Sequence, residues 1–219
     1  MISMEIARSF CSKELKKADV VDSAGKTVGH IGDLTFTFDG VLKLKQFILS
    51  GPAWEEFLEA IKLKPDRDPV FDATLIKKMG DKVHLNTSSN SLKTTLDKDA
   101  ISDDEIRLSK LTKLDILDKN GVNIGRANDV DFDIDGSVSI IVGGGFFEEK
   151  LEAIGLKSDI DLIVPCDVIA SISDTIQLKV SKDELGTTME KVREHIKARE
   201  DIETRREVSK VRLFSHRPF

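Results

Sequence analysis

The acidic run 131–136 comes closer to metal-site spacing than any other part of the sequence. Its three aspartates alternate with Phe132 and Ile134 and precede a glycine, as the first ligands of a calcium-binding loop do. Such a loop needs a bidentate glutamate at its twelfth position, where this chain has Val142. The interleaved apolar residues are typical of a strand. We therefore expect a solvated acidic strand face here and no metal ion.

The three consecutive glycines 143–145 could form a phosphate cradle, because they lie between a predicted strand and a predicted helix. A Walker-type loop would continue with lysine and serine or threonine. This chain continues to Glu148 and Glu149, which favour the positive end of the helix dipole and would repel a phosphate. The pattern favours a structural loop.

The residue types needed for catalysis are present but scattered. His30, His84, His195 and His216 are not spaced with cysteine or carboxylates as metal ligands, and neither a G-x-S-x-G nor an H-E-x-x-H motif occurs. Cys166 is predicted to be a small core residue, and Cys11 an incidental thiol. The sequence thus predicts no enzyme activity, no catalytic residue, no cofactor and no metal.

The composition of the 219 residues is typical of a globular protein with a net charge of −6. A protein that wraps nucleic acid is usually basic, so this charge makes nucleic acid an unfavourable partner. Two cysteines cannot form a disulfide framework, which favours a cytoplasmic protein. The sequence has no apolar run long enough to span a bilayer, and residues 1–10 lack a signal-peptide core.

An internal repeat organises the chain. The pattern Asp22, Gly25, Gly29 recurs as Asp118, Gly121, Gly125 with an offset of 96, and later blocks match with an offset of 93. The repeat divides the chain into an N-terminal arm, a first unit, an acidic linker, a second unit and a charged helix or tail. These segments are residues 1–11, 12–97, 98–107, 108–190 and 191–219.

Each unit reads as short strands joined by tight turns, with one short helix. Asn120 and Gly121 between apolar flanks are a hairpin signal. The segments 34–38 and 130–134 alternate between apolar and polar residues, which predicts half-buried strands. Such units are typical of small β-barrels. We predict a mainly β protein of two small barrels followed by a C-terminal α-helical tail.

The turn pattern resembles that of the PRC-barrel family, named after the photosynthetic reaction-centre H subunit and also found in the ribosome-maturation factor RimM. The resemblance rests on an apolar strand, Asp-x-x-Gly, a Val/Ile-Gly pair, an alternating strand and Asp-Gly, and it covers both repeats. One departure is the glycine run 143–145, where the first repeat has Phe47, Ile48 and Leu49. Gly29 and Gly125 are expected at a bend or a close approach of strands.

The resemblance implies a non-enzymatic assembly module. A tandem pair resembles archaeal CdpB-type cell-division proteins, which implies an adaptor or scaffold that binds SepF, the membrane anchor of FtsZ, and a second PRC-barrel protein. It implies a homodimer or hetero-oligomer at the division site, with only indirect membrane contact. The alternative is an RNA-processing or ribosome-assembly factor of the RimM type. A third possibility is a sensor with a small ligand between its barrels, for which no residue is identified.

The tail is the predicted partner-binding segment. Residues 191–219 carry nine basic and five acidic residues, a net of +4, which leaves −10 on the rest of the chain. An apolar stripe at helical spacing begins before the tail, so two alternatives are open: a helix packed on its own barrel, or a helix that docks a partner. The residues predicted to bind a partner are Leu185, Met189, Val192, Ile196, Leu213, Phe214 and Phe219.

Overall fold

The computed structural model describes residues 4–52, 70–92, 101–153, 155, 161–199 and 210–212. The fold is mainly β, and its backbone contacts divide the chain into two compact units. Unit 1 comprises residues 1–38, 42–109 and 131–138, and unit 2 comprises residues 39–41, 110–130 and 139–219.

The strands are short except for two long ones, β4 and β11. In the first half of the chain they are β1 (Glu5–Ile6), β2 (Phe10–Cys11), β3 (Asp19–Val21), β4 (Thr27–Phe38), β5 (Leu42–Ser50), β6 (Val70–Asp72), β7 (Ile76–Met79) and β8 (Lys82–Leu85). In the second half they are β9 (Ile106–Arg107), β10 (Asp115–Leu117), β11 (Asn123–Phe132), β12 (Val138–Gly143), β13 (Asp161–Val164), β14 (Ile169–Ile172), β15 (Ile176–Leu178) and β16 (Lys210–Arg212).

The helices connect or follow these strands. They are α1 (Ser12–Leu15), α3 (Ser89–Leu92), α4 (Leu108–Leu111), α5 (Gly145–Ala153) and α6 (Lys182–Arg199), with 3-10 turns η1 (Ala73–Leu75) and η2 (Cys166–Val168). The short helix predicted in the first repeat falls on residues outside the described ranges. Its counterpart in the second repeat is α5. In the described part of the chain, no helix combines the length and the apolar character that crossing a bilayer requires.

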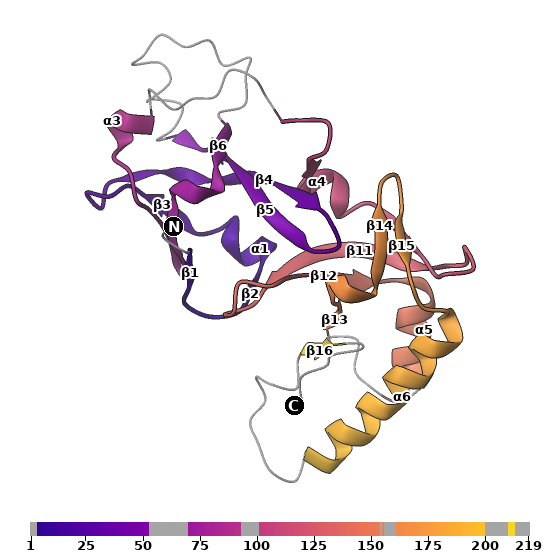
Figure 1. Cartoon of the computed structure of the whole chain (residues 1–219). Coiled ribbons are helices and arrows are strands. Elements are labelled where there is room, and N and C mark those ends of the chain that lie inside the picture. The colour runs from indigo at the N-terminus through magenta and orange to yellow at the C-terminus, as the bar shows by residue number, and fades with distance from the viewer. Residues whose placement is uncertain are drawn as a thin grey trace. The chain divides into compact units, whose positions relative to one another are not determined.

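The strands form two curled sheets (Figure 1). The first has the order β1-β7-β8-β3-β4-β5-β6, with β9 on β4, and the second has the order β14-β15-β10-β11-β12-β13-β16, with β2 on β11. The six strands that the repeat places in equivalent positions therefore follow the same order in both sheets. Both sheets also carry a register shift at the same place in the first hairpin, between Val20 and Val21 and between Ile116 and Leu117.

The short strands β2 and β9 join the two repeats within unit 1. β2 pairs with the end of β11, so that Phe10 lies opposite Phe132, and β9 pairs with β4, so that Ile106 lies opposite Phe36. The ring centroid of Phe132 lies 5.5 Å from that of Phe10 and 6.1 Å from that of Phe36, and all three rings are buried. Residues from both repeats therefore build the core of unit 1.

The long strands are buried on both faces at this point, not half-buried as their alternation predicts. Thr35 is buried like its apolar neighbours, and so is Asp131 on β11. Here β9 pairs with the edge of β4, and the Thr35 hydroxyl donates a hydrogen bond of 2.5 Å to Glu105, just before β9. A buried hydroxyl needs such a partner, and period-two alternation cannot anticipate one supplied from distant sequence.

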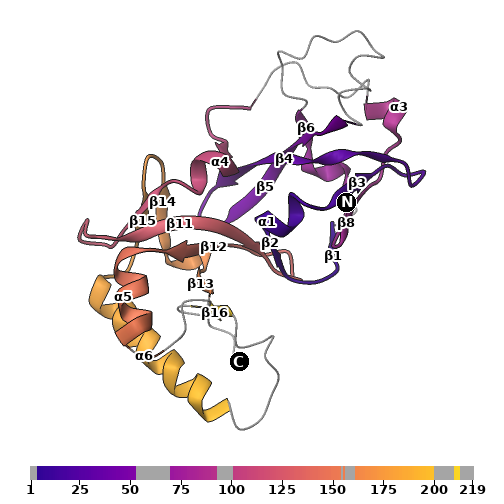
Figure 2. The ribbon, with the colours of Figure 1, turned by 180° about the vertical axis from the view of Figure 1, so that it is seen from behind.

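In unit 2, α5 and α6 lie side by side, and the two views from opposite sides agree on this (Figures 1 and 2). Lys150 of α5 forms a 2.5 Å ion pair with Glu190 of α6. Gly186 lies on the α6 face towards α5, where an added Cβ would meet the Phe146 ring at 3.6 Å. Helix α6 begins at Lys182, ahead of the tail, as its apolar stripe predicts.

Candidate interaction surface

The aspartate of the repeated turn motif holds its unit together through backbone hydrogen bonds. In unit 2, one oxygen of Asp118 accepts from the N–H groups of Asn120 and Val122 at 2.8 and 2.9 Å. The other oxygen accepts from the N–H of Lys182, the first residue of α6, at 2.9 Å. This carboxylate therefore closes the β10–β11 turn and caps a helix at the same time.

Asp22 has the same arrangement in unit 1. Its oxygens accept from the N–H groups of Ala24, Lys26 and Ser89, each at 2.9 Å, and Ser89 is the first residue of α3. Burial of the Asp22 carboxyl opposes its ionisation, but these hydrogen bonds outweigh the burial and lower its pKa. The pKa of Asp118 is lowered by the same balance. The motif that carries the family resemblance thus has a structural role in both halves.

A capping box fixes the start of α6. The hydroxyl of Ser181 accepts from the N–H of Glu184 at 3.2 Å, and the Glu184 carboxylate accepts from the N–H of Ser181 at 2.6 Å. Lys119 adds an ion pair to Glu184 at 2.9 Å. The backbone hydrogen bond from Ser181, followed by Lys119, lowers the pKa of Glu184 to about 2. The ionised carboxylate of Glu184 therefore serves to cap helix α6.

The glycine loop before α5 is organised by its own glutamate. Gly144 and Gly145 have positive φ angles of 78° and 53°, and the Gly144 N–H donates to Glu148 at 3.0 Å. A phosphate at this position would have to displace that carboxylate. An added Cβ on Gly125 would lie 2.8 Å from the Phe147 ring and 3.0 Å from the Gly143 carbonyl oxygen. Gly125 therefore marks a close approach of strand and helix.

The three aspartates of the predicted acidic strand face do not converge. Asp131 is buried, so describing this face as solvated is wrong for that residue. Asp133 accepts from the Ser9 hydroxyl at 2.7 Å, and Asp135 accepts from the Ser137 N–H at 2.9 Å within the hairpin. Across the described ranges, no group of three or more His, Cys, Asp or Glu side chains is placed to hold a metal ion.

The residues predicted to bind a partner fall into two groups. Leu185 and Met189 are only 0% and 1% exposed, so their side chains pack inside unit 2. For these two residues, the burial corresponds to the alternative of a helix packed on its own barrel. The other five residues cannot be placed in this way. The side chains of Val192 and Ile196, and the whole of Leu213, Phe214 and Phe219, lie outside the described part of the chain.

Surface features that the sequence did not single out are exposed apolar side chains and the sheet edges. Val41, Val122 and Ile134 are 50%, 45% and 63% exposed, each at or next to a hairpin turn. Among the described strands, β6 lies at one edge of the first sheet and β14 lies at one edge of the second sheet. Periodicity cannot reveal an edge, because edge position depends on which strands pair. On β14, Ala170 and Ser171 are exposed.

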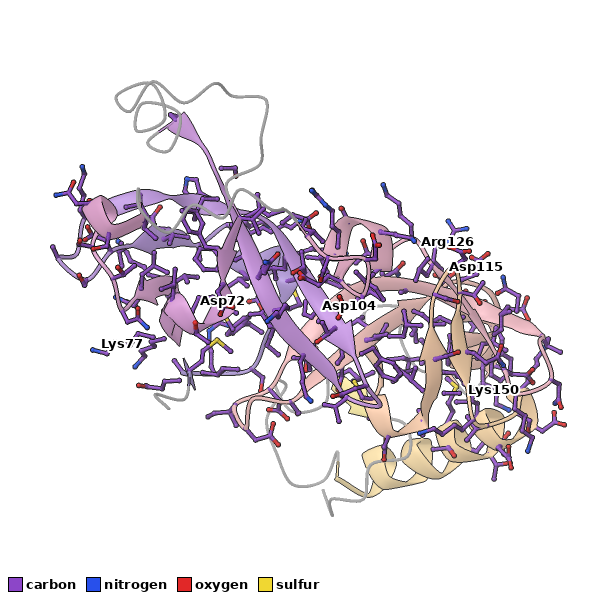
Figure 3. The ribbon with its side chains drawn as sticks, turned by 45° about the horizontal axis from the view of Figure 1, so that its top comes forward. Asp72, Lys77, Asp104, Asp115, Arg126 and Lys150 are labelled. Atoms are coloured by element: carbon purple, nitrogen blue, oxygen red, sulfur yellow. The ribbon has the colours of Figure 1, made fainter. Side chains whose placement is uncertain are left out.

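Two ion pairs in unit 2 link neighbouring strands or helices. Arg126 of β11 contacts Asp115 of β10 at 3.2 Å, and the two side chains lie together in Figure 3. Lys150, also labelled there, belongs to the contact between α5 and α6 described above. The exposed pair of Arg126 and Asp115 contributes little to stability and leaves this surface charged and solvated.

Comparison with known proteins assigns one segment of the chain to a family. No curated protein sequence matches the chain. The PRC-barrel domain family matches residues 103–185, a range that contains the Asp118 turn, the hairpin of β11 and β12, and helix α5. Residues 103–185, which include the Asp118 turn motif, therefore form a PRC-barrel domain.

Proposed function

We propose that this protein is a non-enzymatic adaptor that binds protein partners through two PRC-type barrels. The observation that carries the proposal is the PRC-barrel domain at residues 103–185, preceded by a sheet with the same strand order. The shared turn aspartates, Asp22 and Asp118, support the assignment of residues 12–97 as a second PRC-like barrel. Two linked barrels raise avidity, since binding of the second becomes intramolecular.

The use of buried carboxylates supports a structural protein in preference to an enzyme. Asp22 and Asp118 accept backbone hydrogen bonds, and Asp33 accepts from both the N–H and the hydroxyl of Ser109 at 3.2 and 2.6 Å. A catalytic carboxylate instead needs an oxygen directed at a substrate. The lowered pKa values of Asp22 and Asp118 also keep these groups ionised at neutral pH, which does not favour general acid catalysis.

The cellular setting we propose is archaeal cell division. It rests on the resemblance of the paired turn motifs to CdpB-type proteins. In this setting the chain would act in the cytoplasm at the division site, as a homodimer or with a second PRC-barrel protein. It would bind a SepF-type anchor of FtsZ and reach the membrane only through that anchor.

The test is direct binding and localisation. Purified full-length chain is titrated with a purified SepF-type protein, and a fluorescent fusion is followed in dividing cells. The proposal predicts saturable binding and a band at mid-cell. Diffuse fluorescence in dividing cells, together with no measurable binding, would contradict the cell-division setting.

The tail favours a second candidate function in RNA processing or ribosome assembly. Residues 191–219 carry a net charge of +4, although the rest of the chain carries −10. Phosphate contacts made by such a segment would give binding that weakens steeply with salt. Salt-dependent RNA binding that disappears on deletion of residues 191–219 would favour this function. Unchanged RNA binding by the shortened chain would remove its main support.

A further inference from the structure

The edge of β7 in unit 1 is covered by a short strand from the N-terminus. β1 runs parallel to β7, with Glu5 opposite Lys78 and Ile6 opposite Met79. The Ala7 N–H donates to the Met79 carbonyl at 2.9 Å, and Arg8 contacts Asp81 at 3.3 Å. Residues 5–8 on the β7 edge are therefore an example of a short extended segment that such an edge binds.

The equivalent edge in unit 2 is β14, which has the same local geometry. β7 pairs with β8 with a shift between Ile76 and Lys78, and β14 pairs with β15 with a shift between Ile169 and Ser171. In the part of the chain that the structure describes, β15 is the strand that pairs with β14. The consequence is visible in burial: Met79 is fully buried, whereas its equivalent Ile172 is partly exposed.

The backbone of Ile172 is oriented to accept a further strand. The Ser173 N–H donates to the Thr175 carbonyl at 3.0 Å, towards β15. Because backbone groups alternate sides along a strand, the N–H and C=O of Ile172 face away from β15. Met79 uses the same position to accept from Ala7. When a peptide adds as a further strand at a sheet edge, its main-chain hydrogen bonds give the affinity and its alternate side chains give the specificity.

We propose that the β14 edge binds, in parallel, a short extended segment of a partner protein with the sequence pattern apolar residue, glycine, basic residue. The apolar residue would cover Ile172, as Ile6 covers Met79. The basic residue would reach Asp174, whose side chain is 98% exposed with Lys110 at 3.6 Å, as Arg8 reaches Asp81.

The glycine at the middle position of the bound segment is inferred from a difference between the β7 and β14 edges. Unit 1 has Gly80 next to Ala7, and an added Cβ on Gly80 would lie 3.2 Å from the Ala7 Cβ. Unit 2 has Ser173 at the position of Gly80, so the Cβ is present. The bound segment therefore needs glycine at this position, since the methyl group of alanine would crowd Ser173.

A second copy of this chain does not fit this pattern as well. Its own segment 5–8 is held on β7 by the contacts to Lys78, Met79 and Asp81, and it carries alanine in the middle position. The inference therefore names a partner segment. It rests on the proposed adaptor function and specifies how one partner would be recognised.

The test uses the full chain and a short labelled peptide with the central sequence Glu-Ile-Gly-Arg, measured by fluorescence anisotropy and by amide NMR shifts at Ser171 and Ile172. We expect saturable binding that Ile172→Pro weakens about tenfold, because proline removes the outward N–H while edge strands tolerate it. Asp174→Lys should weaken binding by about two- to fivefold.

Exchanging small residues, glycine for alanine in the peptide and Ser173 for glycine in the protein, gives a test that does not depend on a variant that fails to fold. Wild type should prefer the Gly peptide over a Glu-Ile-Ala-Arg peptide, and Ser173→Gly should bind both equally well. Absence of peptide shifts at β14, equal binding by Ile172→Pro, or a dimer that forms through β14 would each overturn the inference. If the titration with a SepF-type protein succeeds while the peptide fails, the edge assignment falls and the adaptor function stands.

Discussion

Removal of the Asp22 carboxylate tests the structural role of the repeated turn motif. In Asp22→Ala, the N–H groups of Ala24, Lys26 and Ser89 lose their acceptor, and each of these hydrogen bonds is 2.9 Å long in the wild type. Asp22 is only 4% exposed, so water can replace its carboxylate only after the turn opens. We therefore expect the β3–β4 turn and the start of α3 to loosen together.

The size of the effect follows from the number of donors. A hydrogen bond contributes about 1 kcal/mol net, and a charged acceptor contributes more. Three lost bonds, one of them a helix cap, reduce the free energy of unfolding of unit 1 by about 3 kcal/mol. The lowered pKa of Asp22 adds a pH dependence: the stabilisation is present above about pH 4 and is lost as the pH falls through the folded-state pKa.

The assay is urea unfolding followed by circular dichroism at neutral pH and at pH values below 4, with hydrogen exchange in residues 19–31 as a local measure. Asp103→Ala is the matched control, because Asp103 is an exposed aspartate and its removal should change stability by less than about 0.5 kcal/mol. A loss below about 1 kcal/mol in Asp22→Ala would refute the reasoning. A difference from wild type that grows in acid would refute it as well.

Two further perturbations address unit 2. Gly125→Ala places a Cβ 2.8 Å from the Phe147 ring at a φ of 155°, and should lower the free energy of unfolding by about 2–4 kcal/mol in thermal denaturation. Gly121→Ala, with open space around it, should cost about 1 kcal/mol, and equal losses in the two would contradict the close approach. Glu184→Gln should raise hydrogen exchange in the first turn of α6 at neutral pH, whereas Asp183→Asn should not. Because the pKa of Glu184 is lowered to about 2, the stabilisation from its ionised form is lost as the pH falls towards 2, and the difference from wild type should vanish there.

The sequence predicted the strands and turns well where local signals decide them. The Asn120–Gly121 turn, the hairpin formed by β11 and β12, and helix α5 all lie where the pattern placed them. Asn-Gly tolerates positive φ, and Gly121 has a φ of 81°. The starting point of α6 was also predictable, since Leu185 and Met189 share one helix face.

The rest depends on contacts that are distant in sequence. The pairing of β2 with β11 and of β9 with β4 places residues of both repeats in one core, and two-residue strands carry no detectable period. Asp131, which pairs with Cys11 of β2, was expected to lie in solvent because of the alternation, but it is buried. The role of Asp22 and Asp118 as helix caps was not predicted either, because the capped residues lie more than 60 positions away.

The difference between the two sheet edges could not be predicted from periodicity. β7 and β14 occupy equivalent places, but the strand that covers β7 comes from before the first repeat. One local signal was available in retrospect. Lys77 and Lys78 on the covered strand are replaced by Ala170 and Ser171 on the other, so the partner residue of Glu5 is missing there.

The central claim is that this chain binds proteins as an adaptor, and the most direct measurement is affinity purification of the tagged full-length chain from its own cells after nuclease treatment. We expect a SepF-type division anchor to be enriched and to stay bound when RNA is digested. A purification that recovers only ribosomal components and no division protein would contradict the adaptor function.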